Sequence, residues 1–434
     1  MNEAKEMHDE LLNTLLPIIP RTAYQDSRRL SMLVWAITGL CLTHTVRLGA
    51  WAEVLSGHAQ SAASRERRFS RWLHHPAIHP QEWYAPVLQK ALSDWPRSAP
   101  LYIALDTTAL TPFVLIRASL IYRGRAISLA WRAMRHRSTK VGFEDYQPVL
   151  EQVHSIGLTA WPVILLADRG FVHEQLLHYL HQHQWHFRLR LTSNTLVHLP
   201  DQPVSAVRDL CPPAGEKRFF HQVSILGAAV GPVSLALACL LDQPDDPWFV
   251  VSDEPTDVKT LDEYGLRFDI EEAFLDEKSG GYQLHTSELA TLEALERLLL
   301  IVAIATLYLT SIGVSVVQAG KWRWVDAHWG RGLSYLKIGW RWRRQRSQRG
   351  WPMFSPFWLD PAPDPFPVLA SRRDAVGERN DVDLPTAMCG LPESLAVSYQ
   401  KFGHLCAKKD VTVRVVQKPC LVEGINQQLR AQTG

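Results

Sequence analysis

Four residues in the middle of the chain have the types and spacing to bind a phosphate group beside a metal ion. Tyr264, Arg267, Glu271 and Lys278 are separated by two, three and six residues. At about 100° per residue, a helix places them within about 60° of one another. One helix face would then present an acid among two cations and a hydroxyl, which suits a metal ion and phosphate oxygens.

The segment that holds these residues also has an adjoining apolar stripe that can dock on a sheet, formed by Leu266, Ile270, Ala273 and Phe274. Ser279-Gly280-Gly281 is a typical helix stop. Gly265 could interrupt the first turn and move Tyr264 and Arg267 on the helical wheel. The alternative for this segment is an ordinary salt-bridged helix face.

Two aspartates, Asp106 and Asp168, directly follow short apolar runs that we expect to be buried strands. Carboxylates at strand ends are held rigidly at the edge of a sheet. Two divalent cations about 4 Å apart can cleave a phosphodiester bond, and such hard cations prefer carboxylate oxygens. A strand-ending Asp is also a common turn former or cap. With Glu271, the two aspartates predict a two-metal site.

The elements around these acids indicate an α/β fold with a mixed sheet, because they run strand, hairpin, helix, strand, helix, strand. We expect strands at 101–105, 113–121, 126–131, 162–167 and 186–191, and helices at 146–156 and 176–183. Further strand-like pieces at 219–226, 233–241 and 248–252 predict a β-rich insertion over about 193–256. Helical patterns resume near Thr260.

Residues 1–97 read as an all-helical region. Within it, 61–75 is amphipathic, with Ala62, Phe69 and Leu73 on one face. The opposite face carries a short polar residue and three arginines, namely Ser64, Arg67, Arg68 and Arg71. Such a face suits phosphate and major-groove contacts, and a solvated basic face is the alternative.

Composition sets broad limits on these interpretations. The chain has 434 residues, 46% of them hydrophobic and 21% charged, and a net charge of +2. This composition is typical of a soluble globular protein with two or three domains, and gives no overall basic excess for nucleic acid. The start lacks the apolar run of a secretion signal, and six scattered cysteines without a CxxC pair favour a reducing cytosol.

One stretch, Leu298–Val317, is twenty residues long without a charge and meets the length rule for a membrane span. It contains Thr306, Thr310 and Ser311, and no second span accompanies it. We therefore expect a buried core helix and no membrane.

The residues above resemble the DDE transposases of the insertion sequence 4 family, whose signature is Tyr, two residues, Arg, three residues, Glu, six residues, Lys. The first and second aspartates of that family look like Asp106 in Leu-Asp-Thr-Thr and Asp168 in Ala-Asp-Arg-Gly. The resemblance implies an RNase H-like catalytic domain at 98–350, with the β-rich insertion between the second Asp and Glu271. It also implies a DNA-binding role for the helical domain at 1–97 and leaves 351–434 as a weakly structured or accessory region.

Two further DNA contacts are suggested. By the resemblance, Trp248 is the candidate to stack on a flipped-out base, with a core anchor as the alternative. The stretch 321–349 has nine basic residues against one acid, with five interleaved tryptophans. This pattern is typical of a nucleic-acid surface, although a helix with inward tryptophans and outward arginines gives the same pattern.

Together these features predict a cut-and-paste transposase in which Asp106, Asp168 and Glu271 hold two Mg²⁺, with Mn²⁺ as a substitute. Its partners would be double-stranded DNA at transposon ends and target, and a second copy of the chain in a homodimer. A cytoplasmic, nucleoid-associated location in a bacterium follows. The alternatives are an inactive transposase-derived DNA-binding protein and an RNase H-like nuclease that does not join strands.

Overall fold

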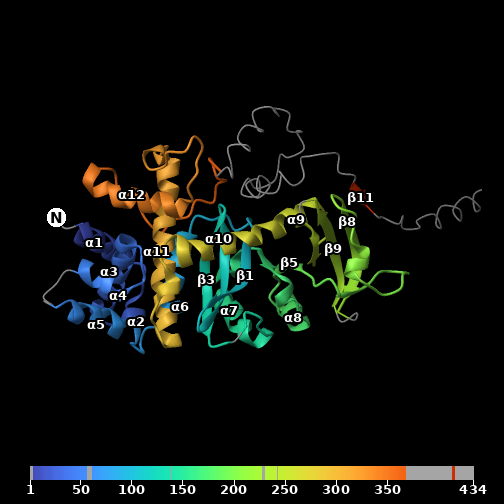
Figure 1. Cartoon of the computed structure of the whole chain (residues 1–434), viewed down its shortest axis with the longest axis horizontal. Helices are drawn as coiled ribbons and strands as arrows, with labels where there is room; N and C mark the ends of the chain where they lie inside the picture. The colour runs from blue at the N-terminus through green and yellow to red at the C-terminus, as the bar shows by residue number, and fades with distance from the viewer. Residues whose placement is uncertain are drawn as a thin grey trace, which may run out of the picture.

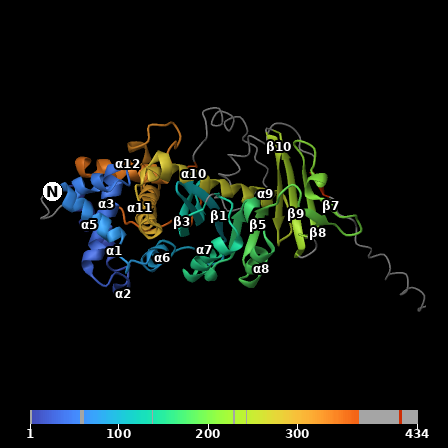
Figure 2. The same cartoon turned by 60° about the horizontal axis from the view of Figure 1, so that its bottom comes forward.

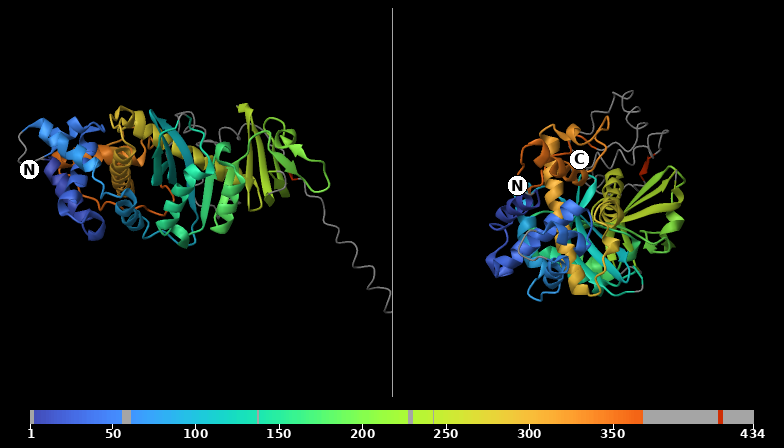
Figure 3. Two further views of the ribbon diagram at one scale, coloured as in Figure 1. Left: turned by 90° about the horizontal axis from the view of Figure 1, so that it is seen from below. Right: turned by 60° about the vertical axis from the view of Figure 1, so that its left-hand side comes forward.

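The computed structural model describes residues 3–55, 61–136, 138–226, 230–241, 243–367 and 413–415. The chain is elongated and runs from a bundle of helices at one end, through a central sheet, to a β-rich end (Figures 1 and 3). The helical end contains α1 (Glu3–Leu15), α2 (Arg21–Tyr24), α3 (Ser27–Thr43), α4 (Leu48–Val54), α5 (Ala62–Leu73) and α6 (Pro80–Ala91).

Helix α5 shows why the N-terminal elements form as the sequence predicts. Its N-cap, Ser61, accepts a hydrogen bond from the backbone N–H of Ser64, which satisfies one of the free donors of the first turn. Phe69, Trp72 and Leu73 are buried, whereas Arg67 and Arg71 are exposed. The predicted amphipathic helix is therefore confirmed.

The central sheet begins with an antiparallel meander of β1 (Leu101–Leu110), β2 (Phe113–Tyr122) and β3 (Arg125–Met134). The tight turn between β2 and β3 has positive φ at Arg123 and Gly124, as a two-residue hairpin requires. Strands β4 (Val163–Ala167) and β5 (His186–Arg190) then add parallel to β1, giving the order β3-β2-β1-β4-β5. The predicted α/β class, with an RNase H-like mixed sheet, is confirmed.

The β-rich insertion continues this sheet. It contains β6 (Leu196–His198), β7 (Ser205–Ala206), β8 (Lys217–Ile225), β9 (Val230–Leu240) and β10 (Gln243–Ser252). Strand β10 pairs antiparallel with β5, so the order runs on as β10-β9-β8-β6-β7, and β11 (Val413–Val415) pairs with β8. The sequence predicted β8, β9 and β10 but not β6, β7 or β11, and it did not show that the insertion would join the central sheet.

Helices cover both faces of the central strands (Figure 2). Helices α7 (Phe143–Ser155) and α8 (Glu174–Gln182) lie on one face, against β2 and β3 and against β5 respectively. Helices α9 (Val258–Gly265) and α10 (Asp269–Leu275) cross the other face, in contact with β1, β3, β5 and β10. Asp106 and Asp168 lie beneath this helical segment, and Glu271 belongs to α10 itself.

Helix α11 (Leu292–Gln318) stands between the N-terminal bundle and the sheet and contacts α3, α5, α6 and β3 (Figure 1). It is long and apolar enough to cross a membrane, because an apolar window of 18 residues within it has a mean hydropathy of 2.3. However, 94% of that apolar window is buried within the protein, as expected for the predicted core helix. Helices α3 and α4, which meet at a bend, are together also long and apolar enough to cross a membrane if they are counted as one span.

Helix α12 (Tyr335–Arg349) crosses α11 at a point where glycines allow the two backbones to touch. A Cβ on Gly313 would lie 2.0 Å from the Tyr335 carbonyl oxygen, and one on Gly339 would lie 1.8 Å from that of Leu309. Neither contact leaves room for a side chain.

The segment from 351 to 367 has no regular structure but packs on the fold. Phe357 and Leu359 are fully buried. Asp360 pairs with Arg123 of the β2–β3 turn at 2.7 Å, and Asp364 pairs with the buried Arg331 at 2.5 Å. Most of the predicted accessory region, 368–434, lies outside the described residues apart from β11.

The predicted end of the first strand was wrong. The sequence placed the end of the first strand at Leu105, but β1 continues to Leu110 because residues 106–110 pair with β2, Asp106 directly opposite Arg117. Asp106 thus lies inside a strand, where pairing on the β2 side holds its backbone.

Candidate active site

Asp106 and Asp168 lie side by side on neighbouring parallel strands. Leu105 of β1 is in register with Ala167 of β4, so the residues that follow them are the two aspartates. Asp168 leaves the sheet as the N-cap of a short 3₁₀ turn, Arg169–Phe171. Both side chains are partly buried and belong to the face covered by α9 and α10.

The signature residues come from a helical segment that is less regular than a single helix. Helix α9 ends at Gly265, a 3₁₀ turn spans Leu266–Phe268, α10 follows, and a π-helical turn covers Asp276–Gly280. The path stays helical through these changes, and the predicted apolar stripe of Leu266, Ile270, Ala273 and Phe274 is buried. Gly281 ends the segment as its C-cap, as predicted.

Arg267 joins two of the three acids. Its Nη1 lies 3.3 Å from Asp106 Oδ2, and its Nη2 lies 2.8 Å from Glu271 Oε1. The guanidinium is buried and stacks over the ring of Phe268 at 4.5 Å, so its position is well defined. Tyr264 reaches the third acid, with its Oη 3.5 Å from Asp168 Oδ1. The three acids and two of the signature residues therefore converge on one site.

The charges at this site affect one another. Burial, with repulsion from Glu271 and Asp168, raises the pKa of Asp106 from 3.8 to about 6, against the opposing effects of Arg267 and the Thr107 N–H. Burial also raises the pKa of Tyr264 to about 12, which keeps its hydroxyl a hydrogen-bond donor. Burial acts to lower the pKa of Arg267, but Tyr264 and the surrounding acids outweigh it and raise that pKa above its usual value.

Lys278 lies on the β1 side of the site. Its Nζ donates to Thr108 Oγ1 at 2.5 Å, two residues beyond Asp106 on the same strand face. Burial and the nearby Arg117 lower its pKa. A cavity of about 320 Å³ adjoins it, lined in part by Phe113, His285 and Leu295.

The donor set fits divalent cations. Three carboxylates converge on one face of the sheet, and burial, with repulsion from Glu271 and Asp168, raises the pKa of Asp106, so a further positive charge would be stabilised there. Among the described residues, these acids are less tightly gathered than His186, Asp253 and Glu254, whose donor atoms all lie within 4.8 Å of one another. Asp106, Asp168 and Glu271 are nevertheless the acids that Arg267 and Tyr264 contact.

Residues 136–308 match the family described as "Transposase DDE domain". The matched segment includes Asp168 and the signature from Tyr264 to Lys278, whereas Asp106 precedes it. This match supports a DDE transposase. It covers less than half of the 434 residues, and membership of the insertion sequence 4 family stays a prediction.

The other comparisons add little detail. No curated protein matches this chain in sequence. Among solved structures, a cryo-EM structure of the piggyBac transposase synaptic complex with hairpin DNA is similar with a TM-score of 0.43 and 11% identity. That alignment covers 90% of this chain and 87% of that chain. The fold assignment itself rests on the strand order and register described above.

Trp248, the predicted base-stacking residue, is buried beside the candidate site. Its ring packs edge-on against Tyr264, with centroids 5.2 Å apart, and stacks on Phe268 at 5.7 Å. Its exposed fraction is 5%. In this conformation Trp248 has the contacts of a core anchor, one of the two roles that the sequence left open.

The two basic segments lie on α5 and on the stretch that includes α12. Arg67 and Arg71 are exposed on α5, and Arg68 is half-buried there, in the N-terminal bundle of Figure 1. In the stretch 321–349 the pattern is mixed, because Trp322, Trp340 and Trp342 are buried while Trp324 and Trp329 are exposed. Its exposed basic residues are Arg323, Arg341, Arg344 and Arg349.

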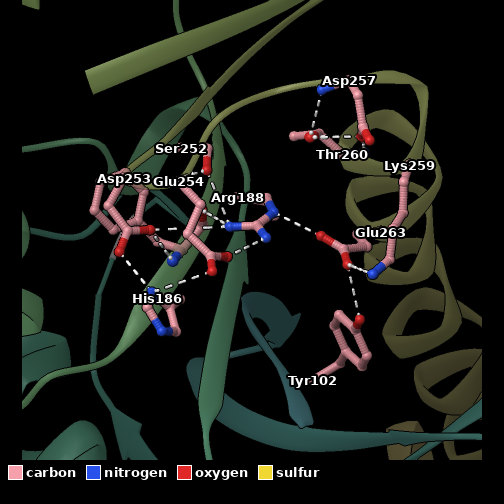
Figure 4. Close-up of polar contacts among 11 residues, drawn as sticks. Tyr102, His186, Arg188, Ser252, Asp253, Glu254, Asp257, Lys259, Thr260 and Glu263 are labelled. Atoms are coloured by element: carbon pink, nitrogen blue, oxygen red, sulfur yellow. Dashed lines mark hydrogen bonds and ion pairs between the residues drawn. The ribbon is translucent and has the colours of Figure 1, made fainter. Parts of the chain in front are cut away.

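Sequence reasoning missed the buried arginines that hold the signature segment on the sheet. Arg117 of β2 pairs with Glu277, and Arg188 of β5 pairs with Glu263 (Figure 4 shows the second pair). Each glutamate directly precedes a signature residue, Lys278 or Tyr264. A charged residue inside an apolar strand is the one sequence signal that could have indicated them.

Proposed function

We propose that this chain is a cut-and-paste DNA transposase that cleaves the ends of its element and joins the freed 3′-hydroxyls to target DNA. The observation that supports this most is the contact of Arg267 with both Asp106 and Glu271, with Tyr264 reaching Asp168. Two residues of the family signature, Arg267 and Tyr264, thus lie beside acids that are far from them in the sequence. The spacing of that signature favours the insertion sequence 4 family within the DDE transposases.

Asp106, Asp168 and Glu271 would hold two Mg²⁺ or Mn²⁺ ions. When bound, such ions supply an activated water or hydroxyl nucleophile and stabilise the leaving oxygen. Arg267 and Glu271 belong to the same helical segment and bind each other. A cation bound by Glu271 would therefore free the Nη2 of Arg267 to donate to a phosphate oxygen.

The cations and the hydroxyl of the segment would orient the scissile phosphate. Arg267 can offer its Nη2, and Lys278 a point charge on the β1 side of the acids. Tyr264, whose pKa is raised to about 12 by burial, stays protonated and donates one hydrogen bond. Positioning and charge stabilisation are the main tasks of a protein in phosphoryl transfer.

Double-stranded DNA would contact surfaces beyond the catalytic segment. The exposed arginines of α5, Arg67 and Arg71, with the half-buried Arg68, would contact phosphates of the transposon end. The exposed basic residues of α12 offer a second surface, with Trp324 beside Lys321. A homodimer acting on paired ends in the bacterial cytoplasm completes the proposal.

The direct test is Glu271→Gln with a linear DNA that carries one transposon end. A loss of about 4 kcal/mol of transition-state stabilisation would lower the rate of Mg²⁺-dependent nicking roughly 1000-fold. Binding of the end should persist, because Gln keeps the shape of the side chain. Glu272→Gln is the matched control, since Glu272 pairs with Arg125 at 3.4 Å and does not face the acids. Undiminished nicking by Glu271→Gln would refute the assignment.

Supplying a pre-cut end with a free 3′-hydroxyl separates transposition from the alternatives. A transposase joins this end to a second DNA, whereas a nuclease with the same fold yields hydrolysed products alone. An inactive DNA-binding descendant would bind the end and do neither with Mg²⁺ or Mn²⁺.

A further inference from the structure

Glu277, which directly precedes Lys278, forms a buried two-point pair with the sheet. Arg117 donates from Nη1 to Oε1 at 2.8 Å and from Nη2 to Oε2 at 2.7 Å. The side chains are 2% and 4% exposed. Arg117 is the cross-strand partner of Asp106, so both side chains belong to the same face of the sheet.

Glu263, which directly precedes Tyr264, is held in a similar way. Arg188 Nε donates to its Oε2 at 2.7 Å, and the hydroxyl of Tyr102 donates to its Oε1 at 2.9 Å. Arg188 also binds Glu254 at 2.6 Å and the hydroxyl of Ser252 at 3.0 Å (Figure 4). The network thus ties α9 to β1, β5 and the end of β10.

Arg188, the arginine of this second pair, is also close to the candidate site along the sheet. Arg188 of β5 lies opposite Leu166 of β4, two residues before Asp168. Tyr102 precedes Asp106 by four residues on β1, on the same strand face. Each buried pair therefore connects the sheet near a catalytic aspartate to the residue before a signature side chain.

Such pairs can fix both the rotation and the position of a helix. An apolar stripe tolerates small shifts along a sheet, whereas a guanidinium that meets both oxygens of a carboxylate fits one arrangement. Shifting the segment by one residue would leave Arg117 and Glu277 as separate buried charges, which is strongly unfavourable. The π-helical turn that contains Glu277 is held at a second point, because Asp276 pairs with Arg125 at 2.9 Å and with Lys337 at 3.0 Å.

We propose that Arg117–Glu277 and Arg188–Glu263 are positioning pairs that set the signature side chains over Asp106 and Asp168. Because the four charged residues act through Tyr264 and Lys278, they need not touch DNA themselves. This inference rests on the proposed function in that the site positioned is the metal and phosphate site of a transposase.

The test uses the full chain with Glu277→Gln or Glu263→Gln, each of which removes a charge and keeps the shape. Two measurements follow: the affinity for Mn²⁺, and hydrogen exchange of backbone amides. We expect each variant to bind Mn²⁺ roughly 10–100-fold more weakly, the usual effect of losing a partner that orients metal ligands. Exchange should accelerate across 258–280 and stay unchanged in β4. Arg117→Lys, which keeps the charge and loses the two-point contact, should give a smaller loss.

Glu272→Gln again serves as the matched control on α10 and should change neither quantity. A purely structural role predicts faster exchange in β4 as well as in 258–280, with Mn²⁺ affinity of the folded protein unchanged, and this result would overturn the proposal. If Glu271→Gln also leaves Mn²⁺ binding unchanged, the proposed metal site is refuted instead. Exchange in 258–280 still decides the positioning role in that case, because unchanged exchange in both Gln variants would overturn it.

Discussion

The guanidinium of Arg267 lies 3.3 Å from the carboxylate of Asp106, although 161 residues separate them in the chain. The contact joins α9–α10 to the middle of β1 and is mostly shielded from water. It does not fully compensate the acid, since burial and the neighbouring carboxylates still raise the pKa of Asp106 to about 6. The site thus concentrates negative charge at a cost in stability, as functional sites often do.

This charge predicts a pH-dependent effect of Asp106→Asn. Between about pH 4 and 6 the folded protein holds a proton on Asp106 that the unfolded chain has lost, so stability falls as pH rises through this window. A pKa rise from 3.8 to about 6 corresponds to roughly 3 kcal/mol at pH 7.5. Asp106→Asn removes the cost, so its free energy of unfolding should exceed that of the wild type by up to this amount at pH 7.5.

Urea unfolding at pH 4 and pH 7.5, with chelator present, measures the effect. The gain should nearly vanish at pH 4, where the wild-type carboxyl is protonated in the folded state. Glu53→Gln, at an exposed position on α4, should show no such pH dependence. An Asp106→Asn variant that is less stable than the wild type at pH 7.5 would contradict the charge balance described for the site.

Trp248 provides a prediction that separates packing from base stacking. Its burial against Tyr264 and Phe268 predicts that Trp248→Ala lowers the free energy of unfolding by about 3–5 kcal/mol. Trp248→Phe should cost less and should leave the fluorescence of 2-aminopurine, placed near the transposon end, as in the wild type. A change in that fluorescence with Trp248→Phe at unaltered stability would instead assign the ring to a base.

The sequence predicted best those features that depend on neighbouring residues. Short apolar runs indicated most strands, and the predicted hairpin is present, with positive φ at Arg123 and Gly124 of its turn. The extension of β1 beyond Asp106 was missed because it depends on pairing with β2. The joining of the insertion to β5 through β10 depends likewise on a contact between distant segments.

The candidate site shows the same division. The spacing from Tyr264 to Lys278 placed four side chains on one helical segment, although the segment contains a 3₁₀ turn and a π turn. Arg117 could not be assigned from sequence, because its partner Glu277 lies 160 residues away. The role of a buried arginine depends on the acid that pairs with it, and that acid is identified from the folded structure.

The exposed arginines of α5 predict a change in the salt dependence of DNA binding. If Arg67 and Arg71 each neutralise one phosphate, the double variant to Ala should reduce the slope of log affinity against log salt by about 1.8. Binding should weaken similarly for different end sequences, since phosphate contacts carry no sequence information. Arg28→Ala with Lys90→Ala removes the same charge from exposed sites elsewhere in the bundle. An equal reduction in slope for this control would remove α5 as the specific DNA surface.

The crossing of α11 and α12 gives a prediction on stability alone. A methyl group at Gly313 or Gly339 would overlap a backbone carbonyl, at 2.0 Å or 1.8 Å, and a helix must move to admit it. We expect Gly339→Ala to lower the free energy of unfolding by about 1–3 kcal/mol or more, as overpacking does. Gly49→Ala in α4 meets no atom closer than 3.8 Å and should raise it by roughly 0.5–1 kcal/mol through helix propensity. Urea unfolding of both variants measures these changes. A lower free energy of unfolding for Gly339→Ala with a higher one for Gly49→Ala requires a backbone contact at the crossing, whereas changes of the same sign exclude it.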